Sequence, residues 1–176
     1  MTAPGPLKLS FQWRDEIAER IGHKGQGVWL HELGEWMELK EGLPPQKPER
    51  FHIASSSFRE VSIKLHDPGW ETHETVEDDE WVLYEATLIA YDDLAHLPFG
   101  LFVTSETPQS AMAKLSTDAS PNGRLDPNAD ACSVTYFLKD HRAVVVTFRR
   151  GLVGIRSILV TRLFDWPDWR MRKPKQ

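Results

Sequence analysis

The residues Phe58-Arg-Glu-Val-Ser-Ile-Lys-Leu-His66 alternate between apolar and polar side chains, the pattern of a strand with one buried face. A second extended run follows, Trp81-Val-Leu-Tyr-Glu-Ala-Thr-Leu-Ile-Ala-Tyr91, rich in β-branched and aromatic residues. Between the two runs, Asp67-Pro-Gly69 is a turn signal. The two runs therefore predict a long antiparallel hairpin, with the residues between them as its connection.

The second half of the chain has the same predicted order as the first half, namely a helix, a loop and then strands. Thr107 followed by Pro108 predicts a helix start, because threonine caps helices and proline fits the first helical position. Three apolar, extended runs come after a polar loop and predict a meander of three antiparallel strands: Cys132–Lys139, Ala143–Arg149 and Ile155–Leu163.

The N-terminal part predicts a helix over 11–21, where Trp13, Ile17 and Ile21 recur every four residues on one face. The stretch 28–39 fits either a strand or a helix. Together these patterns predict an α+β fold: an antiparallel β-sheet, built from a long hairpin and a C-terminal three-strand meander, with two short helices.

A chain of 176 residues is long enough for one domain with a substantial core. We expect a single α+β domain over 1–176, with subdomains at 10–95 and 96–165 and a basic tail at 166–176. The single cysteine, Cys132, rules out a disulfide framework within one chain and fits a reducing compartment. No apolar run is long enough to cross a bilayer, so we expect a cytoplasmic protein without a membrane partner.

The charge distribution is strongly uneven. The stretch 65–113 contains no Lys or Arg but eleven acids, namely Asp67, Glu71, Glu74, Glu77, Asp78, Asp79, Glu80, Glu85, Asp92, Asp93 and Glu106. The stretch 139–176, in contrast, contains ten Lys or Arg and three acids. An acidic middle would repel phosphates, so we expect a basic protein surface as the partner, rather than nucleic acid.

The densest part of the acidic stretch supplies the candidate contact residues. Acids on a loop accelerate the encounter with a cationic surface, and large aromatic residues next to them are typical interface anchors. The predicted partner-binding residues are Trp70, Glu71, Glu74, Glu77, Asp78, Asp79, Glu80 and Trp81. A solvated hairpin loop without a partner is the alternative interpretation.

No motif in the sequence predicts catalysis, a cofactor or a metal site. The seven histidines show no paired spacing such as His-x-x-x-His, and zinc would need ligands from separate segments. Cys132 lies on the same face of its strand as Val134 and Tyr136, which favours a buried structural thiol over a nucleophile. Four adjacent acids at 77–80 are typical of a solvated loop rather than of a carboxylate pair with separated pKa values.

Two short motifs carry a resemblance to a known family. Leu97-Pro-Phe-Gly-Leu-Phe-Val103, then Thr107-Pro-Gln-Ser-Ala-Met-Ala-Lys-Leu115, followed by a loop and a meander, resembles immunity proteins encoded beside polymorphic and type VI secretion toxins of Gram-negative bacteria. The resemblance covers roughly residues 58–163. Ser116 stands where that family usually has glycine, and its aspartate–tryptophan pattern is absent around residue 130.

The resemblance implies a non-enzymatic antitoxin that binds and neutralises a cognate secreted toxin, such as a nuclease or another cationic enzyme. Inhibition by plugging the active site and inhibition by binding beside it both remain open, as does the oligomeric state. Two other classes are kept as alternatives: a small α+β enzyme or ligand-binding protein, and an adaptor domain of a secretion system.

Overall fold

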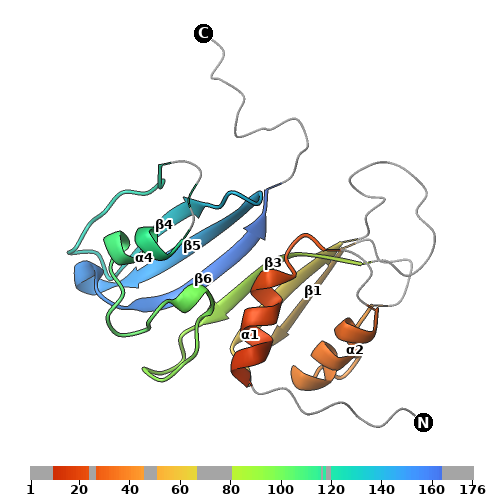
Figure 1. Cartoon of the computed structure of the whole chain (residues 1–176). Helices are drawn as coiled ribbons and strands as arrows, with labels where there is room; N and C mark the ends of the chain where they lie inside the picture. Colours follow the sequence, from red (N-terminus) through yellow and green to blue (C-terminus); the bar gives the residue numbers. More distant parts are fainter. Residues whose placement is uncertain are drawn as a thin grey trace.

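The computed structural model describes residues 10–23, 27–45, 51–66, 81–115, 117 and 120–163. These residues form the helices α1 (Ser10–Glu19), α2 (Gly27–Trp36) and α4 (Pro108–Lys114), and the short 3-10 turns η1 (Pro98–Gly100) and η2 (Arg150–Leu152). The six strands are β1 (Phe51–Ser56), β2 (Val61–His66), β3 (Val82–Ile89), β4 (Ala131–Phe137), β5 (Arg142–Arg149) and β6 (Ile155–Arg162) (Figure 1).

All six strands belong to one antiparallel sheet with the order β1-β2-β3-β6-β5-β4. The predicted hairpin is confirmed as the pair β2–β3, and the predicted meander as β4–β5–β6. The two halves meet in the middle of the sheet, where β3 pairs with β6. The α+β class and the antiparallel sheet are therefore confirmed, and the two predicted subdomains share a single sheet.

Two elements add to the predicted fold. β1 forms a third strand of the first half, which the sequence did not predict. The stretch that fitted either strand or helix forms α2, which buries Trp29, Leu30 and Leu33. These side chains recur with helical spacing, so α2 presents one apolar stripe to the core.

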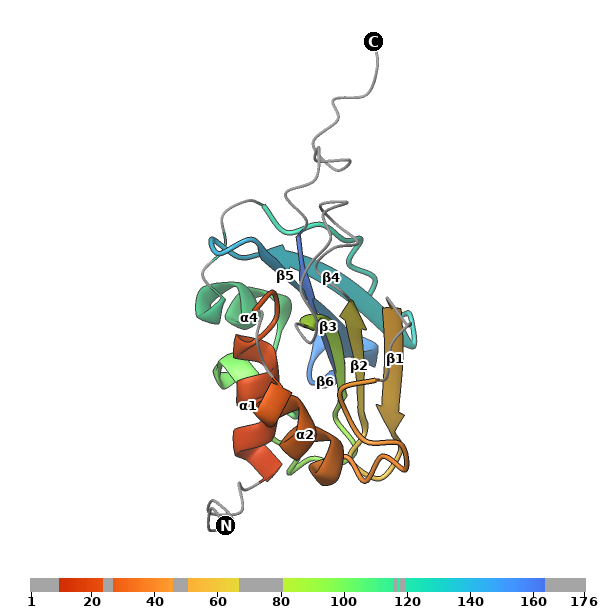
Figure 2. The ribbon, with the colours of Figure 1, turned by 90° about the vertical axis from the view of Figure 1, so that its right-hand side faces the viewer.

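The register of the strands separates two faces of the sheet. One row of paired residues crosses all six strands as Ala54, Ile63, Ala86, Val160, Val144 and Tyr136. Each of these side chains is buried, and all of them except Ala54 are at most 1% exposed. The helices lie on this face only (Figure 2), so the core fills the space between the helices and the sheet.

The predicted apolar face of α1 is confirmed: Trp13, Ile17 and Ile21 are all buried. Trp13 stacks on Trp36 at a ring-centroid distance of 5.7 Å and contacts Trp29 at 5.8 Å. Aromatic pairs at such distances contribute about 0.5–1.5 kcal/mol beyond the area they bury. The indoles therefore join α1 and α2 into one layer.

The predicted start of the helix at Thr107 is confirmed. The hydroxyl oxygen of Thr107 accepts a hydrogen bond from the Ser110 amide at 3.2 Å, and Pro108 is the first helical residue. The Tyr136 hydroxyl of β4 donates to the Pro108 carbonyl at 3.0 Å. Burial raises the pKa of Tyr136 to about 12, so the phenol stays protonated and holds α4 to the sheet at neutral pH.

Candidate functional site

The acidic segment, defined as residues 67–80, joins two neighbouring strands. β2 ends at His66 and β3 begins at Val82, and these two residues are directly paired. The segment therefore begins and ends at the same end of the sheet, as a hairpin connection must. Trp70, Glu71, Glu74, Glu77, Asp78, Asp79 and Glu80, all predicted contact residues, lie outside the described residues.

Trp81 is the one predicted contact residue that the structure describes, and its role needs correction. Its side chain is only 2% exposed and belongs to the hydrophobic core. An indole buried to this degree supports the start of β3 from inside and offers a partner almost no surface. Trp81 is therefore a core residue and not an exposed anchor.

The same end of the sheet carries a second charged part of the sequence. β6 runs antiparallel to β3, so Arg162 lies at the end of the sheet where β3 begins. Residues 164–176, which contain the predicted basic tail at 166–176, follow directly and lie outside the described residues. Both strongly charged stretches of the chain thus leave from one end of the sheet, called here the charged end.

Among the described residues, the face of the sheet opposite the helices, called here the open face, has no helix over it (Figure 2) and is largely uncharged. A row of partly or fully exposed residues crosses it as Ser55, Ser62, Thr87, Leu159, Val145 and Thr135. In the neighbouring row, Lys64 and Glu85 form an ion pair of 2.6 Å between β2 and β3. No described helix lies over this open face (Figure 2).

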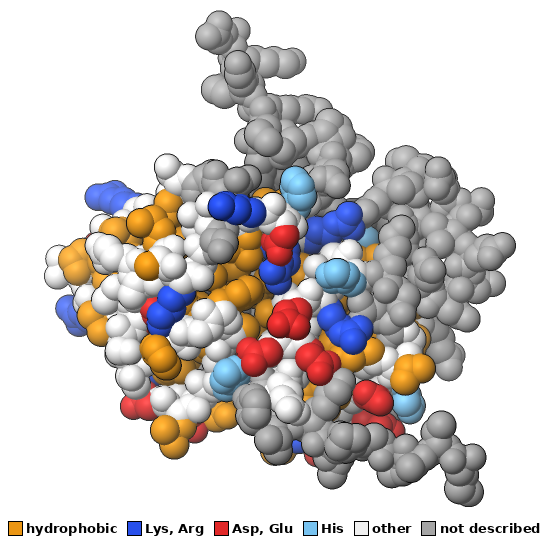
Figure 3. All heavy atoms as spheres, in the orientation of Figure 1, with side chains coloured by type: hydrophobic (Ala, Val, Ile, Leu, Met, Phe, Trp, Pro, Cys, Tyr) orange, Lys and Arg blue, Asp and Glu red, His pale blue; other side chains and the backbone are white. Residues whose placement is uncertain are grey.

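The helix-covered face has a different character. Side chains of both charge signs gather over α1 on that face (Figure 3). On α1, Asp15 is 2.8 Å from His96, and Glu16 accepts a hydrogen bond from the Trp29 indole at 2.7 Å. Mixed charges that already contact protein groups produce little net field, so this face is a weaker candidate for a charged partner.

The Leu-Pro-Phe-Gly-Leu motif forms a tight turn that packs into the core. Leu97, Pro98 and Leu101 are buried, whereas Phe99 and Gly100 adopt left-handed conformations with φ of 65° and 68°. Such a conformation is routine for glycine and costs a residue with a side chain roughly 1–2 kcal/mol. The motif on which the family resemblance rests is therefore mainly part of the scaffold.

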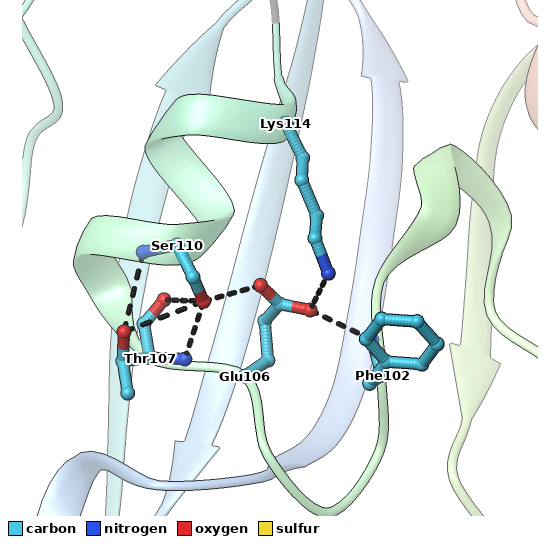
Figure 4. A network of polar contacts seen from close by, with 5 residues as sticks. All are labelled: Phe102, Glu106, Thr107, Ser110 and Lys114. Carbon is cyan, nitrogen blue, oxygen red and sulfur yellow. Dashed lines mark hydrogen bonds and ion pairs between the residues drawn. The ribbon is translucent and has the colours of Figure 1, made fainter.

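A buried carboxylate fastens this motif to α4 (Figure 4). Glu106 is 1% exposed and accepts hydrogen bonds from the Phe102 amide at 2.7 Å, the Lys114 ammonium at 2.7 Å and the Ser110 hydroxyl. Burial alone would raise the pKa of Glu106, but together the hydrogen bonds from Lys114, Ser110 and Phe102 lower it below its ordinary value. Glu106 is therefore charged at neutral pH.

A hollow of about 250 Å³ opens at the charged end, lined by Phe99, Lys114, Leu115, Leu138, Lys139, Asp140 and Arg142. The Arg142 guanidinium donates to Asp140 at 2.6 and 2.8 Å and to the Ala18 carbonyl at 2.6 Å. The hydrogen bonds from Arg142 lower the pKa of Asp140. Two of the lining cations thus already contact acids, and the hollow is smaller than most small-molecule sites, which span about 300–1,000 Å³.

The residues weighed for catalysis or metal binding do not converge among the described parts of the chain. No group of three or more His, Cys, Asp or Glu side chains there could hold a metal ion. Cys132 is buried, as predicted, and its thiol donates to the Arg124 carbonyl at 2.8 Å. None of the helices formed by the described residues has the length and apolarity needed to cross a membrane.

Two buried charged residues were not singled out in the sequence. Arg14 is 3% exposed and donates to the carbonyls of His96, Ile89 and Arg59 at 3.0, 2.8 and 3.3 Å. The only sequence signal for the burial of Arg14 is that this charged residue lies next to Trp13, on the apolar side of α1. The sequence signal for Glu106 is its spacing of four and eight residues from Ser110 and Lys114.

Comparisons of the chain with protein-family models, with curated proteins and with solved structures return no match.

Proposed function

We propose that this protein is a cytoplasmic immunity protein that binds and neutralises a cognate secreted antibacterial toxin with a basic surface. The observation that carries the proposal is the placement of the acidic segment. It joins two directly paired strands, His66 to Val82, and the face of this sheet opposite the helices is largely uncharged among the described residues. A concentrated negative charge beside an uncharged surface suits a protein partner that is attracted electrostatically and then buried.

Each part of this surface has its own role in the proposed complex. The acids at 71–80 attract the toxin and neutralise the lysines or arginines with which a cationic enzyme holds its substrate. The open face then supplies side chains that lose little on leaving water, such as Leu159 and Val145 at its centre. No catalytic residue is required, because inhibition follows from occupying the toxin surface.

The resemblance to immunity proteins gives independent support. Its motif includes the turn at η1 and the helix α4, which the buried carboxylate of Glu106 holds together. A scaffold of this kind holds the sheet in place, and the segments that connect its strands are where binding residues are typically found. The proposed toxin contact therefore lies at the acidic segment and not in the motif.

A charge-reversal variant tests the contact surface. Replacing Glu77, Asp78, Asp79 and Glu80 by lysine is expected to weaken toxin binding by about tenfold or more, mainly through slower association. The salt dependence of the association rate should also fall, because the attraction that salt screens has been removed. Surface plasmon resonance at two or more salt concentrations measures both effects.

A matched control distinguishes the effect of charges in the acidic segment from the effect of the total net charge. Glu19, Glu32, Glu35 and Glu41 are exposed outside the acidic segment, and replacing these four by lysine changes the net charge equally. We expect this control to affect binding much less than the reversal at 77–80. Equal losses of affinity in the two variants, or no loss in either, would show that the acidic segment is not the contact surface.

A further inference from the structure

The two edges of the sheet differ in how the chain protects them. At the β4 edge, Asn122 and Thr135 exchange backbone hydrogen bonds of 2.7 and 2.9 Å, and Thr117 forms a bridge with Leu138. Gly123 lies so close to β4 that a Cβ atom would be 2.6 Å from the Ser133 carbonyl oxygen. The chain itself therefore closes this edge. Among the described residues, nothing pairs with the outer edge of β1.

The sequence of β1 lacks the features that normally protect an open edge. Phe51-His-Ile-Ala-Ser-Ser56 contains no Lys, Arg, Asp, Glu or Pro. Its pairing with β2 is continuous from Phe51 to Ser56 without a bulge. Phe51 is 44% exposed and Ile53 is 55% exposed. Edge strands usually carry charges, prolines or bulges that prevent pairing with another chain, so an unprotected apolar edge indicates a partner strand.

We propose that β1 pairs with β1 of a second copy of this chain, antiparallel and around a two-fold axis. Residues that are paired across an antiparallel ladder point to the same face of the sheet. On β1 the odd-numbered residues lie on the open face. The open faces of the two copies therefore lie on the same side of the joint sheet only when odd-numbered residues are paired with odd-numbered residues. The register that places Ile53 opposite Ile53 of the second copy, and Phe51 opposite Ser55, meets this condition and buries the most exposed apolar residue of the strand.

The chain favours this closed pair over other arrangements. An open fibre would require β1 of one copy to pair with the β4 edge of the next, and that edge is already occupied. A two-fold pair of β1 strands uses the same edge of both copies and therefore closes on itself. The acidic segment begins at His66, which is paired with Phe51. In the antiparallel pair the Phe51 ends point in opposite directions, so the two His66 residues, at which the acidic segments begin, lie at opposite ends of the joint edge.

The proposed pair is independent of toxin binding, because it uses the backbone of the edge strand and not the residues of the acidic segment. In this register five residues of each β1 strand, 51–55, are paired over about 17 Å, a contact smaller than that of most stable dimers. We therefore expect a reversible dimer with a dissociation constant in the range of about 10–100 μM. Both copies have a net charge of −5, so added salt should strengthen the pair by screening their repulsion.

Sedimentation velocity of the full chain at about 1–300 μM tests the proposal. We expect a monomer–dimer equilibrium for the wild type and a dissociation constant at least about tenfold higher for Ile53→Lys, in which two lysines lie opposite each other. Leu94→Lys is the matched control, because Leu94 is 93% exposed outside the sheet, and it should dimerise like the wild type.

Oxidative crosslinking keeps the test independent of any effect of lysine on folding. The variant Ile53→Cys should form a disulfide-linked dimer, because the two-fold axis places the two thiols side by side. Leu94→Cys should form far less, and Cys132 interferes little because it is buried. A monomer at all concentrations, an unchanged dimer in Ile53→Lys, or equal crosslinking of the two cysteine variants would each overturn the proposal.

Discussion

Replacement of Arg14 by methionine is expected to lower the free energy of unfolding by about 3–5 kcal/mol. The guanidinium donates to three backbone carbonyls that belong to different parts of the chain, those of Ile89, His96 and Arg59. Methionine fills a similar volume but donates no hydrogen bond, and each buried carbonyl left unpaired costs roughly 1–3 kcal/mol. Chemical denaturation followed by tryptophan fluorescence measures the change.

Two further variants sharpen this prediction. Arg14→Lys retains the positive charge, but a single ammonium group cannot reach three carbonyls in different directions, so it should recover only part of the loss. Arg156→Met changes an exposed arginine and should alter the free energy of unfolding by less than about 0.5 kcal/mol. Similar small losses for Arg14→Met and Arg156→Met would contradict the role assigned to Arg14.

Replacement of Glu106 by alanine is expected to destabilise the fold by about 3–5 kcal/mol. The truncation leaves the Phe102 amide, the Ser110 hydroxyl and the Lys114 ammonium without their shared acceptor. Glu106→Gln retains an acceptor oxygen but loses the charge, so a smaller loss of about 2 kcal/mol should result. Glu41→Gln, at an exposed position, serves as the control and should have little effect.

Glu106 also predicts a dependence of stability on pH. The folded pKa of its carboxyl group lies below the ordinary value of 4.5, so the carboxylate stabilises the fold above that pH. This contribution is lost as the pH falls from 4.5 through the folded pKa. Between pH 6 and pH 3, the free energy of unfolding of the wild type should therefore fall more steeply than that of Glu106→Gln. Parallel pH profiles of the two proteins would contradict the ionised, hydrogen-bonded state.

The elements predicted correctly from the sequence are those in which local pattern and tertiary burial agree. Within the predicted strand Phe58–His66, the residues from Val61 onward alternate with a period of two, and the observed strand β2 buries Val61, Ile63 and Leu65 on one face. Thr107-Pro108 starts α4 because its capping interactions are local. The three strands of the meander are likewise set by short apolar runs separated by turns.

The elements that the sequence left open depend on distant partners. β1 contains two serines and an alanine among its six residues, so its local preference for a strand is weak, and its pairing with β2 decides the conformation. α2 contains two tryptophans and two glycines, which are poor helix formers. Its helix is stabilised by packing, since Trp29 and Trp36 both contact Trp13 of α1.

For the candidate site, the sequence shows where the acidic residues lie along the chain, but not which of the nearby side chains are buried. That the acidic segment is a hairpin connection followed from the two strands on either side of it. Trp81 was wrongly expected at the surface, because an aromatic residue at the border of a loop and a strand can point either way, and only the tertiary packing decides. Arg14 was missed for the same reason, since its three carbonyl partners are distant in sequence.

Protection of living cells is the most direct test of the central claim. A secreted toxin encoded beside this gene would be expressed in bacteria together with the full chain, and survival would be counted. We expect the wild-type chain to restore growth, and the chain with lysine at residues 77–80 to fail although it folds and accumulates equally. If cells with abundant wild-type protein still die, the chain is not the immunity protein of that toxin.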